Sequence, residues 1–177
     1  MAILPIRTFG DPVLRQRATE VGGISDLEQK LFDDMIETMR DAPGIGLAAT
    51  QVGRLARIFV WEVGEEHGAV VNPSITRRSD ETEVDEEGCL SLPGIVYEVE
   101  RSIAVTVEGL DRAGDATLIE AEGLQARVFQ HEIDHLDGVL FIDRLPGELR
   151  KEALGILRDV ALGLRPPTRP ATSEEVL

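Results

Sequence analysis

The sequence predicts an α+β fold, in which antiparallel or mixed β-sheets surround a central helix and further helices lie near both ends of the chain. Two observations support this class. Segments rich in β-forming residues follow one another through short turns, and helical patterns precede, interrupt and follow them. We expect one folded domain over residues 1–165, because 177 residues suffice for a single core, and a flexible proline-rich tail over residues 166–177.

The first predicted helix lies within SDLEQKLFDDMIETMRDAPG. Ser25 is followed three residues later by Glu28, which is the spacing of a capping box at a helix start. Pro43 and Gly44 end the pattern. The apolar residues between them fall on one broad face that we expect to pack on the core, namely Leu27, Leu31, Phe32, Met35, Ile36 and Met39.

The β-rich segments come next. ARIFVWEV (56–63) and GAVVNPSI (68–75) are predicted to pair through a hairpin loop at residues 64–68. IAVTVEGL (103–110) alternates apolar and polar residues, and the DRAG turn at 111–114 leads into DATLIEAEG (115–123) as a second hairpin. Strands joined by such short turns pair antiparallel.

Two helices complete the prediction. One runs from about Leu124 to Leu136 and is closed by Asp137 and Gly138. The other runs from about Pro146 to Leu162.

Composition and charge limit the function classes. The net charge of −15 argues against a nucleic-acid partner, since phosphate binding needs clustered cations. Six of the acids fall in DETEVDEEG (80–88), and such a run is usually solvated. No run approaches the roughly 20 apolar residues of a membrane span, and the N-terminus lacks a secretory signal. We therefore expect a cytoplasmic protein with no membrane partner.

The residues best suited to metal binding and catalysis lie together in FQHEIDHLDG (129–138). His131 and His135 are four residues apart, so a helix can point both imidazoles at one ion, and Glu132 lies beside them as a base for bound water. The alternative is a pair of exposed histidines. It is disfavoured because apolar residues accompany the histidines as well as the opposite side of the helix, which predicts burial on both sides.

Two histidines leave the third metal ligand open. Glu148 and Glu152 lie at a distance that a metallopeptidase could use, but both suit a solvated helix face. His67 lies in the predicted hairpin loop. Cys89 is the single cysteine, and its thiolate with two imidazoles gives a three-ligand site with an open position. This ligand set favours zinc.

Three motifs together resemble the peptide deformylase family. They are GIGLAATQ (44–51), EGCLS (87–91) and QHEIDH (130–135), supported by GDPVLR near the start and GVLFIDRL after the helix. The resemblance covers about Ile6 to Leu145. It implies a hydrolase that removes the formyl group from the N-terminal formyl-methionine of newly made polypeptides and releases formate.

The resemblance also implies the roles of individual residues. Cys89, His131 and His135 would hold one divalent metal, whose bound water attacks the formyl carbon with Glu132 as general acid/base. Gln51 and the backbone N–H of Leu90 would stabilise the oxyanion. The family typically uses Fe(II), and zinc or nickel can replace it in purified protein.

A methionine substrate needs an apolar pocket. Leu124 and Val128 lie on the histidine side of the helix by spacing, and we expect them to line it with Ile45, Gly46 and Gly88.

Two charged residues near these motifs have two readings each. Arg127, also on the histidine side, is expected at the pocket rim or paired with an acid. Glu87 is either solvated or tied to Arg101, and the family's salt bridge favours the second reading.

Further alternatives concern partners and activity. Some members of the family dock on the ribosome through a basic C-terminal helix, whereas the last helix here is charge-balanced, so only a transient ribosome contact is expected. A metallopeptidase and a non-enzymatic metal-binding domain are the competing functions. The intact motifs disfavour the non-enzymatic domain.

Overall fold

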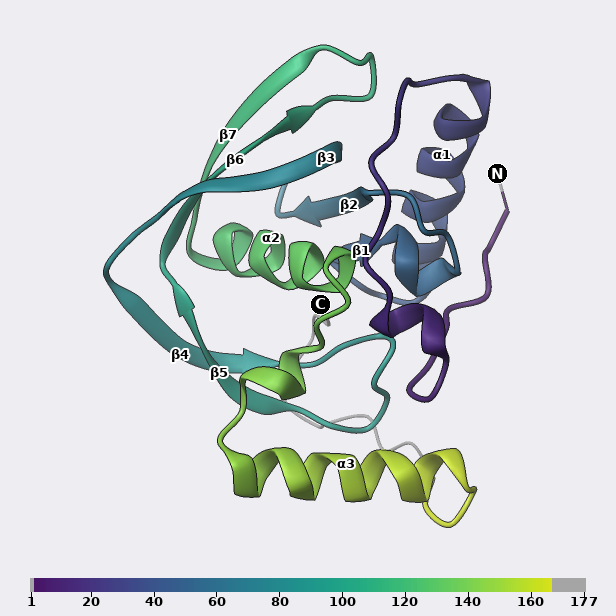
Figure 1. Cartoon of the computed structure of the whole chain (residues 1–177), viewed down its shortest axis with the longest axis vertical. Helices are drawn as coiled ribbons and strands as arrows, with labels where there is room; N and C mark the ends of the chain where they lie inside the picture. Colours follow the sequence, from purple (N-terminus) through teal and green to yellow (C-terminus); the bar gives the residue numbers. More distant parts are fainter. Residues whose placement is uncertain (1, 167–177) are drawn as a thin grey trace.

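The computed structural model describes residues 2–166 and confirms the α+β class (Figure 1). A five-stranded antiparallel sheet has the order β1-β2-β3-β6-β7, and β4 and β5 form a separate two-stranded hairpin. The strands are β1 (Gly46–Ala48), β2 (Ile58–Val63), β3 (Glu66–Arg78), β4 (Thr82–Glu87), β5 (Tyr97–Ser102), β6 (Ala104–Leu110) and β7 (Ala116–Glu122).

Three α-helices accompany the strands. They are α1 (Asp26–Asp41), α2 (Gly123–Leu136) and α3 (Gly147–Ala161). Three short 3₁₀ turns precede α1, follow β1 and connect α2 to α3, namely η1 (Pro12–Arg15), η2 (Ala49–Val52) and η3 (Phe141–Arg144). No helix within residues 2–166 is long and apolar enough to cross a bilayer. The division into a domain over 1–165 and a tail over 166–177 stays a prediction, and the tail beyond residue 166 lies outside the described residues.

The sheet separates α1 from α2. In β2, Phe59 and Trp61 share a buried cluster with Phe129 of α2, whereas Ile58 and Val60 share another with Phe32 of α1. Successive side chains of a strand point to opposite faces, so the apolar run of β2 serves both helices. Every residue of α2 from Ala126 to Leu136 is buried, as its two apolar sides predict.

The capping box of α1 is confirmed. Ser25 Oγ accepts from the Leu27 N–H at 3.2 Å, and Glu28 Oε2 accepts from the Ser25 N–H at 2.8 Å. The prediction that Leu27 packs on the core is wrong, since this side chain is 76% exposed. It lies in the first turn, before the helix meets the sheet.

The predicted hairpin loop at 64–68 is too long. β2 ends at Val63 and β3 begins at Glu66, so His67 lies in a strand opposite Glu62. A two-residue turn suffices because Gly64 adopts a positive φ of 62°, which matches the twist of the two strands.

The β4–β5 hairpin was not predicted from the sequence, because β4 lies within the acidic run. Its register pairs Thr82 with Ser102 and Glu87 with Tyr97. The interpretation of the acidic run as solvated is confirmed for residues 82–86 of β4, which are exposed. It is wrong for Glu87, which is fully buried. This hairpin matters for function because Cys89 follows two residues after its first strand.

Candidate active site

Cys89, His131 and His135 converge at one point. Their ligand atoms all lie within 4.8 Å of one another, and no other group of this kind was found within residues 2–166. Cys89 Sγ lies 3.2 Å from His135 Nε2, and the two imidazole centroids are 4.9 Å apart. The two histidines come from adjacent turns of α2, while the cysteine comes from the loop after β4.

The orientation of His131 is set by a buried carboxylate. Its Nδ1 lies 3.0 Å from Glu87 Oε2, while its Nε2 is buried without a partner among the described residues. A histidine held in this way by an outer carboxylate presents its other nitrogen for coordination. Burial would raise the pKa of Glu87, but hydrogen bonds from Arg101 and His131 outweigh it and hold this pKa far below its ordinary value.

Glu132 carries a fully buried carboxylate. Neither oxygen has a hydrogen-bond partner within the described part of the chain. Burial, with the nearby negative charge of Glu87, raises the pKa of Glu132 well above its ordinary value. The carboxylate lies against β1, since a Cβ added to Gly46 would come within 2.4 Å of Glu132 Oε1.

The residues of this cluster fit a divalent cation. Buried polar atoms are almost always hydrogen-bonded, so the unpartnered Nε2 of His131 and oxygens of Glu132 indicate a site for an additional group. A thiolate and two imidazoles are good ligands for first-row metals. Burial raises the pKa of the Cys89 thiol and lowers that of His135, and a cation would stabilise the thiolate and suit the neutral imidazole.

Gln51 points its amide at the cysteine loop. It is fully buried in η2, where Oε1 accepts from the Ala48 N–H at 2.8 Å. Its Nε2 lies 3.7 Å from Cys89 Sγ and donates to Ser91 Oγ at 3.3 Å. Leu90, the other predicted oxyanion residue, is half-buried directly after Cys89. The structure therefore brings both residues beside the cluster.

The predicted pocket residues do not all lie together. Val128 and Ile45 are buried in the same apolar cluster, and Gly46 and Gly88 are buried beside Glu132 and Cys89 respectively. Leu124, in contrast, is 42% exposed in the first turn of α2. Helical spacing carries no information on how far the neighbouring strands reach along the helix.

The alternative third ligands lie elsewhere. Glu148, Glu152 and His67 are all exposed, and none belongs to the cluster. Glu152 instead accepts a hydrogen bond from the Tyr97 hydroxyl at 3.1 Å. The preference for Cys89 as the third member is therefore consistent with the geometry.

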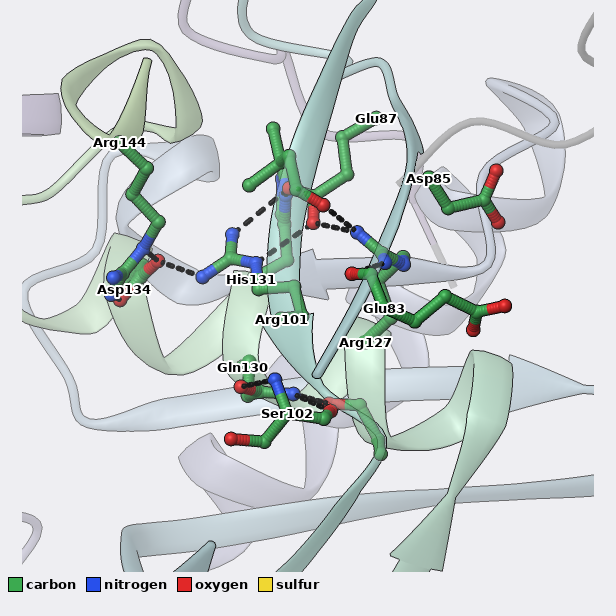
Figure 2. A network of polar contacts seen from close by, with 12 residues as sticks. Glu83, Asp85, Glu87, Arg101, Ser102, Arg127, Gln130, His131, Asp134 and Arg144 are labelled. Carbon is green, nitrogen blue, oxygen red and sulfur yellow. Dashed lines mark hydrogen bonds and ion pairs between the residues drawn. The ribbon is translucent and has the colours of Figure 1, made fainter. Parts of the chain in front are cut away.

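A largely buried ion network adjoins the cluster at His131 (Figure 2). Arg101 donates to both oxygens of Glu87, through Nε at 2.8 Å and Nη2 at 2.9 Å, which confirms the predicted pair. Its Nη1 donates to Asp134 at 2.6 Å, and Arg144 also binds Asp134. Arg127 is buried and paired with Glu87, so the second of its two readings is correct.

Asp134 and Arg144 were missed by the sequence reasoning. A signal was present, because Asp134 belongs to a helix that is apolar on two sides. A carboxylate buried in such a helix requires a cationic partner.

Comparisons with known proteins identify the family of this chain. The sequence model of the family described as polypeptide deformylase matches residues 3–151. The peptide deformylase of Acidothermus cellulolyticus is 48% identical over 159 residues, covering 90% of this chain and 88% of the relative. That of Rhizobium meliloti is 54% identical over 148 residues, covering 81% and 85%.

Solved structures show the same fold. The crystal structure of peptide deformylase from Ehrlichia chaffeensis superposes with a TM-score of 0.87 at 36% identity, covering 92% of this chain and 98% of that one. The enzyme from Thermotoga maritima gives 0.80 at 50% identity, covering 82% and 99%. This chain therefore belongs to the polypeptide deformylase family.

Proposed function

We propose that this chain removes the formyl group from N-formylmethionyl polypeptides with one divalent metal held by Cys89, His131 and His135. The observation that carries the proposal is the convergence of these three ligand atoms within 4.8 Å in a buried site. The unpartnered carboxylate of Glu132 belongs to the helical turn between the two histidines. When bound, the metal would supply Lewis acidity and make a water nucleophilic near neutral pH.

Glu132 is proposed as the general acid/base. Its carboxylate accepts the proton of the attacking water and later delivers it to the leaving amine, so that formate and a free N-terminus are released. Burial raises the pKa of Glu132, which suits a group that must hold a proton between the two steps. The lack of a competing hydrogen bond among residues 2–166 leaves both oxygens free for this transfer.

Gln51 and Leu90 are proposed to stabilise the oxyanion. The Gln51 amide is held by its own Oε1 contact to the Ala48 N–H, so Nε2 remains directed at the cysteine loop. The Leu90 backbone N–H is proposed as the second donor. Removing one donor of this kind typically costs roughly 10²–10³ in rate.

Val128 and Ile45 are proposed to contact the methionine side chain. Both are apolar, Val128 lies three residues before His131 in α2, and Ile45 directly precedes Gly46, which lies against Glu132. Gly46 and Gly88 would let the substrate backbone approach, and Leu124 would contribute at the outer end of α2.

The crystal structures of relatives from Ehrlichia chaffeensis and Synechococcus elongatus are complexes with actinonin. We infer that the same site of this chain binds actinonin.

The proposal also covers the identity of the metal and the cellular location of the enzyme. Fe(II) is proposed as the metal in the cell, with zinc or nickel as substitutes in purified protein, since one thiolate and two imidazoles suit all three. The enzyme would act in the cytoplasm on nascent polypeptides, with at most a transient ribosome contact. Arg150 and Arg158 of α3 lie against Asp143 and Asp159, which does not favour α3 as a basic docking helix.

The decisive experiment replaces Glu132 by glutamine. Glu132→Gln keeps the shape of the side chain, so we expect unchanged metal content and a fall in formate release of roughly 10²–10⁴ from a formyl-Met peptide. The exposed Glu148 of α3 provides the control Glu148→Gln, which should retain wild-type activity. The protein should be prepared anaerobically with its metal measured.

Two outcomes would contradict the proposal. Wild-type turnover in Glu132→Gln would remove this residue from the reaction. Cleavage of the peptide backbone in place of formate release would favour the metallopeptidase alternative.

A further inference from the structure

Arg127 joins α2 to both strands of the β4–β5 hairpin. It is only 4% exposed, and its Nη1 donates to Glu87 Oε1 at 2.9 Å and to the Val99 carbonyl at 2.8 Å. Its Nη2 donates to the Glu83 carbonyl at 3.0 Å, as Figure 2 shows. A buried ion pair is often no more stable than a pair of well-packed apolar side chains in the same place, so stability alone does not explain why an arginine and a glutamate are paired here.

The partners of Arg127 adjoin the proposed metal ligands. Arg127 lies four residues before His131 on the same side of α2, and Glu87 lies two residues before Cys89. His131 Nδ1 contacts Glu87 Oε2 at 3.0 Å while Arg127 holds Oε1 of the same carboxylate. Glu87 thus links the helix that carries both histidines to the segment that carries the cysteine.

Removing Arg127 would not leave a buried carboxylate unpaired. Glu87 keeps its two hydrogen bonds from Arg101, and Asp134 keeps Arg101 and Arg144. Breaking a buried ion pair is most damaging when one charge loses its only partner. We therefore expect the fold to survive the substitution. The hydrogen bonds by which Arg127 connects the hairpin to α2 would be lost.

We propose that Arg127 is a positioning residue for the metal centre, which acts through Glu87 and the hairpin to hold Cys89 in place relative to His131 and His135. This proposal rests on the proposed function, because it takes these three residues as metal ligands. Arg127 donates hydrogen bonds to a carboxylate and two carbonyl groups and, within the described part of the chain, to none of the proposed ligands. Losing a direct partner of a metal ligand typically weakens metal binding by roughly 10–100-fold, and Arg127 acts one contact further out, through Glu87, so we expect the lower end of that range.

The test compares Arg127→Met with the control Arg78→Met, which replaces an exposed arginine that also hydrogen-bonds to α2. Arg78 Nη1 donates to Gln130 Oε1 of α2 at 2.9 Å, and no contact joins it to Glu87 within the described residues. Zinc affinity of the folded proteins is measured by chelator competition, and cobalt-loaded samples report the thiolate–metal absorption. Thermal unfolding of the metal-free proteins is recorded alongside, because a merely structural arginine would change that quantity alone.

We expect Arg127→Met to bind zinc roughly tenfold more weakly, with an altered cobalt spectrum, and Arg78→Met to match the wild type. Wild-type zinc affinity in Arg127→Met, or an equal loss in both variants, would overturn the proposal. If Arg127→Met does not fold, Arg127→Gln is judged by the same comparison. A wild-type protein that binds no zinc or cobalt would overturn the proposed function together with this inference.

Discussion

Gly46 shows how a single missing Cβ can place a proposed catalytic group. A methyl at this position would meet Glu132 Oε1 at 2.4 Å and Cδ at 2.9 Å, so the side chain or β1 would have to move. We therefore expect Gly46→Ala to displace the carboxylate and to lower kcat by about 10²-fold, since small misplacements of a reacting group carry penalties of this size. Steady-state formate release at saturating formyl-Met peptide measures the effect.

Gly155 supplies the control for that substitution. It lies in α3, and a methyl group added there would meet no atom within 4 Å, so Gly155→Ala should raise the free energy of unfolding by about 0.5–1 kcal/mol and leave kcat unchanged. Metal content should stay at the wild-type level in both variants. A Gly46→Ala enzyme with full kcat would show that Glu132 tolerates displacement, which contradicts a role that depends on its position.

At the scale of elements, Asp143 links η3 to η1 and α3. It accepts hydrogen bonds from Arg15 of η1, from Arg150 Nη2 of α3 at 2.9 Å, and from the Leu140 N–H at 2.9 Å. Burial acts to raise the pKa of Asp143, but these partners outweigh it and the net shift is downward. The carboxylate is therefore held in its charged form in the folded protein.

This shift gives a pH dependence of stability. As the pH falls through the ordinary aspartate range, the unfolded chain takes up the proton first, so stability is lost on acidification and is fully present above that range. We expect Asp143→Asn to lower the free energy of unfolding by roughly 1 kcal/mol at pH 7. The difference from wild type should shrink towards pH 3 in urea titrations.

Asp159→Asn is the control for Asp143, because the Asp159 carboxylate pairs with its neighbour Arg158 near the end of α3 and with no other side chain among residues 2–166. Its stability should stay within about 0.5 kcal/mol of wild type at both pH values. A constant difference between wild type and Asp143→Asn across the titration would contradict the assigned shift.

The elements differ in how far the sequence could predict them. α1 and α2 could be predicted, because a capping box and a helix with two apolar sides are local sequence patterns. β4 could not be predicted, since five of its six residues are exposed and the burial of Glu87 depends on Arg101, Arg127 and His131, which come from later segments. Within the candidate site, ligand chemistry was enough to favour Cys89 as the third metal ligand. The contacts of Arg127 and Asp134 depend on tertiary pairing that no local spacing encodes.

The whole molecule carries a net charge of −15, and part of it lies beside the proposed active site. The β4–β5 hairpin exposes Glu83, Asp85, Glu86, Glu98 and Glu100, and its first strand ends two residues before Cys89. A field of one sign around a site concentrates substrates of the opposite charge, and salt screens it.

We therefore expect formyl-Met peptides with lysines downstream to react with a higher kcat/KM at low ionic strength than peptides with glutamates there. Raising the salt from about 0.02 M to about 0.5 M shortens the Debye length from roughly 20 Å to roughly 4 Å, so the advantage, on the order of tenfold, should largely disappear. A neutral formyl-Met peptide, whose kcat/KM should change little, separates this effect from salt effects on the enzyme. Equal salt responses of the cationic and anionic peptides would show that the acidic hairpin does not act on the substrate, and its charges would then serve only solvation.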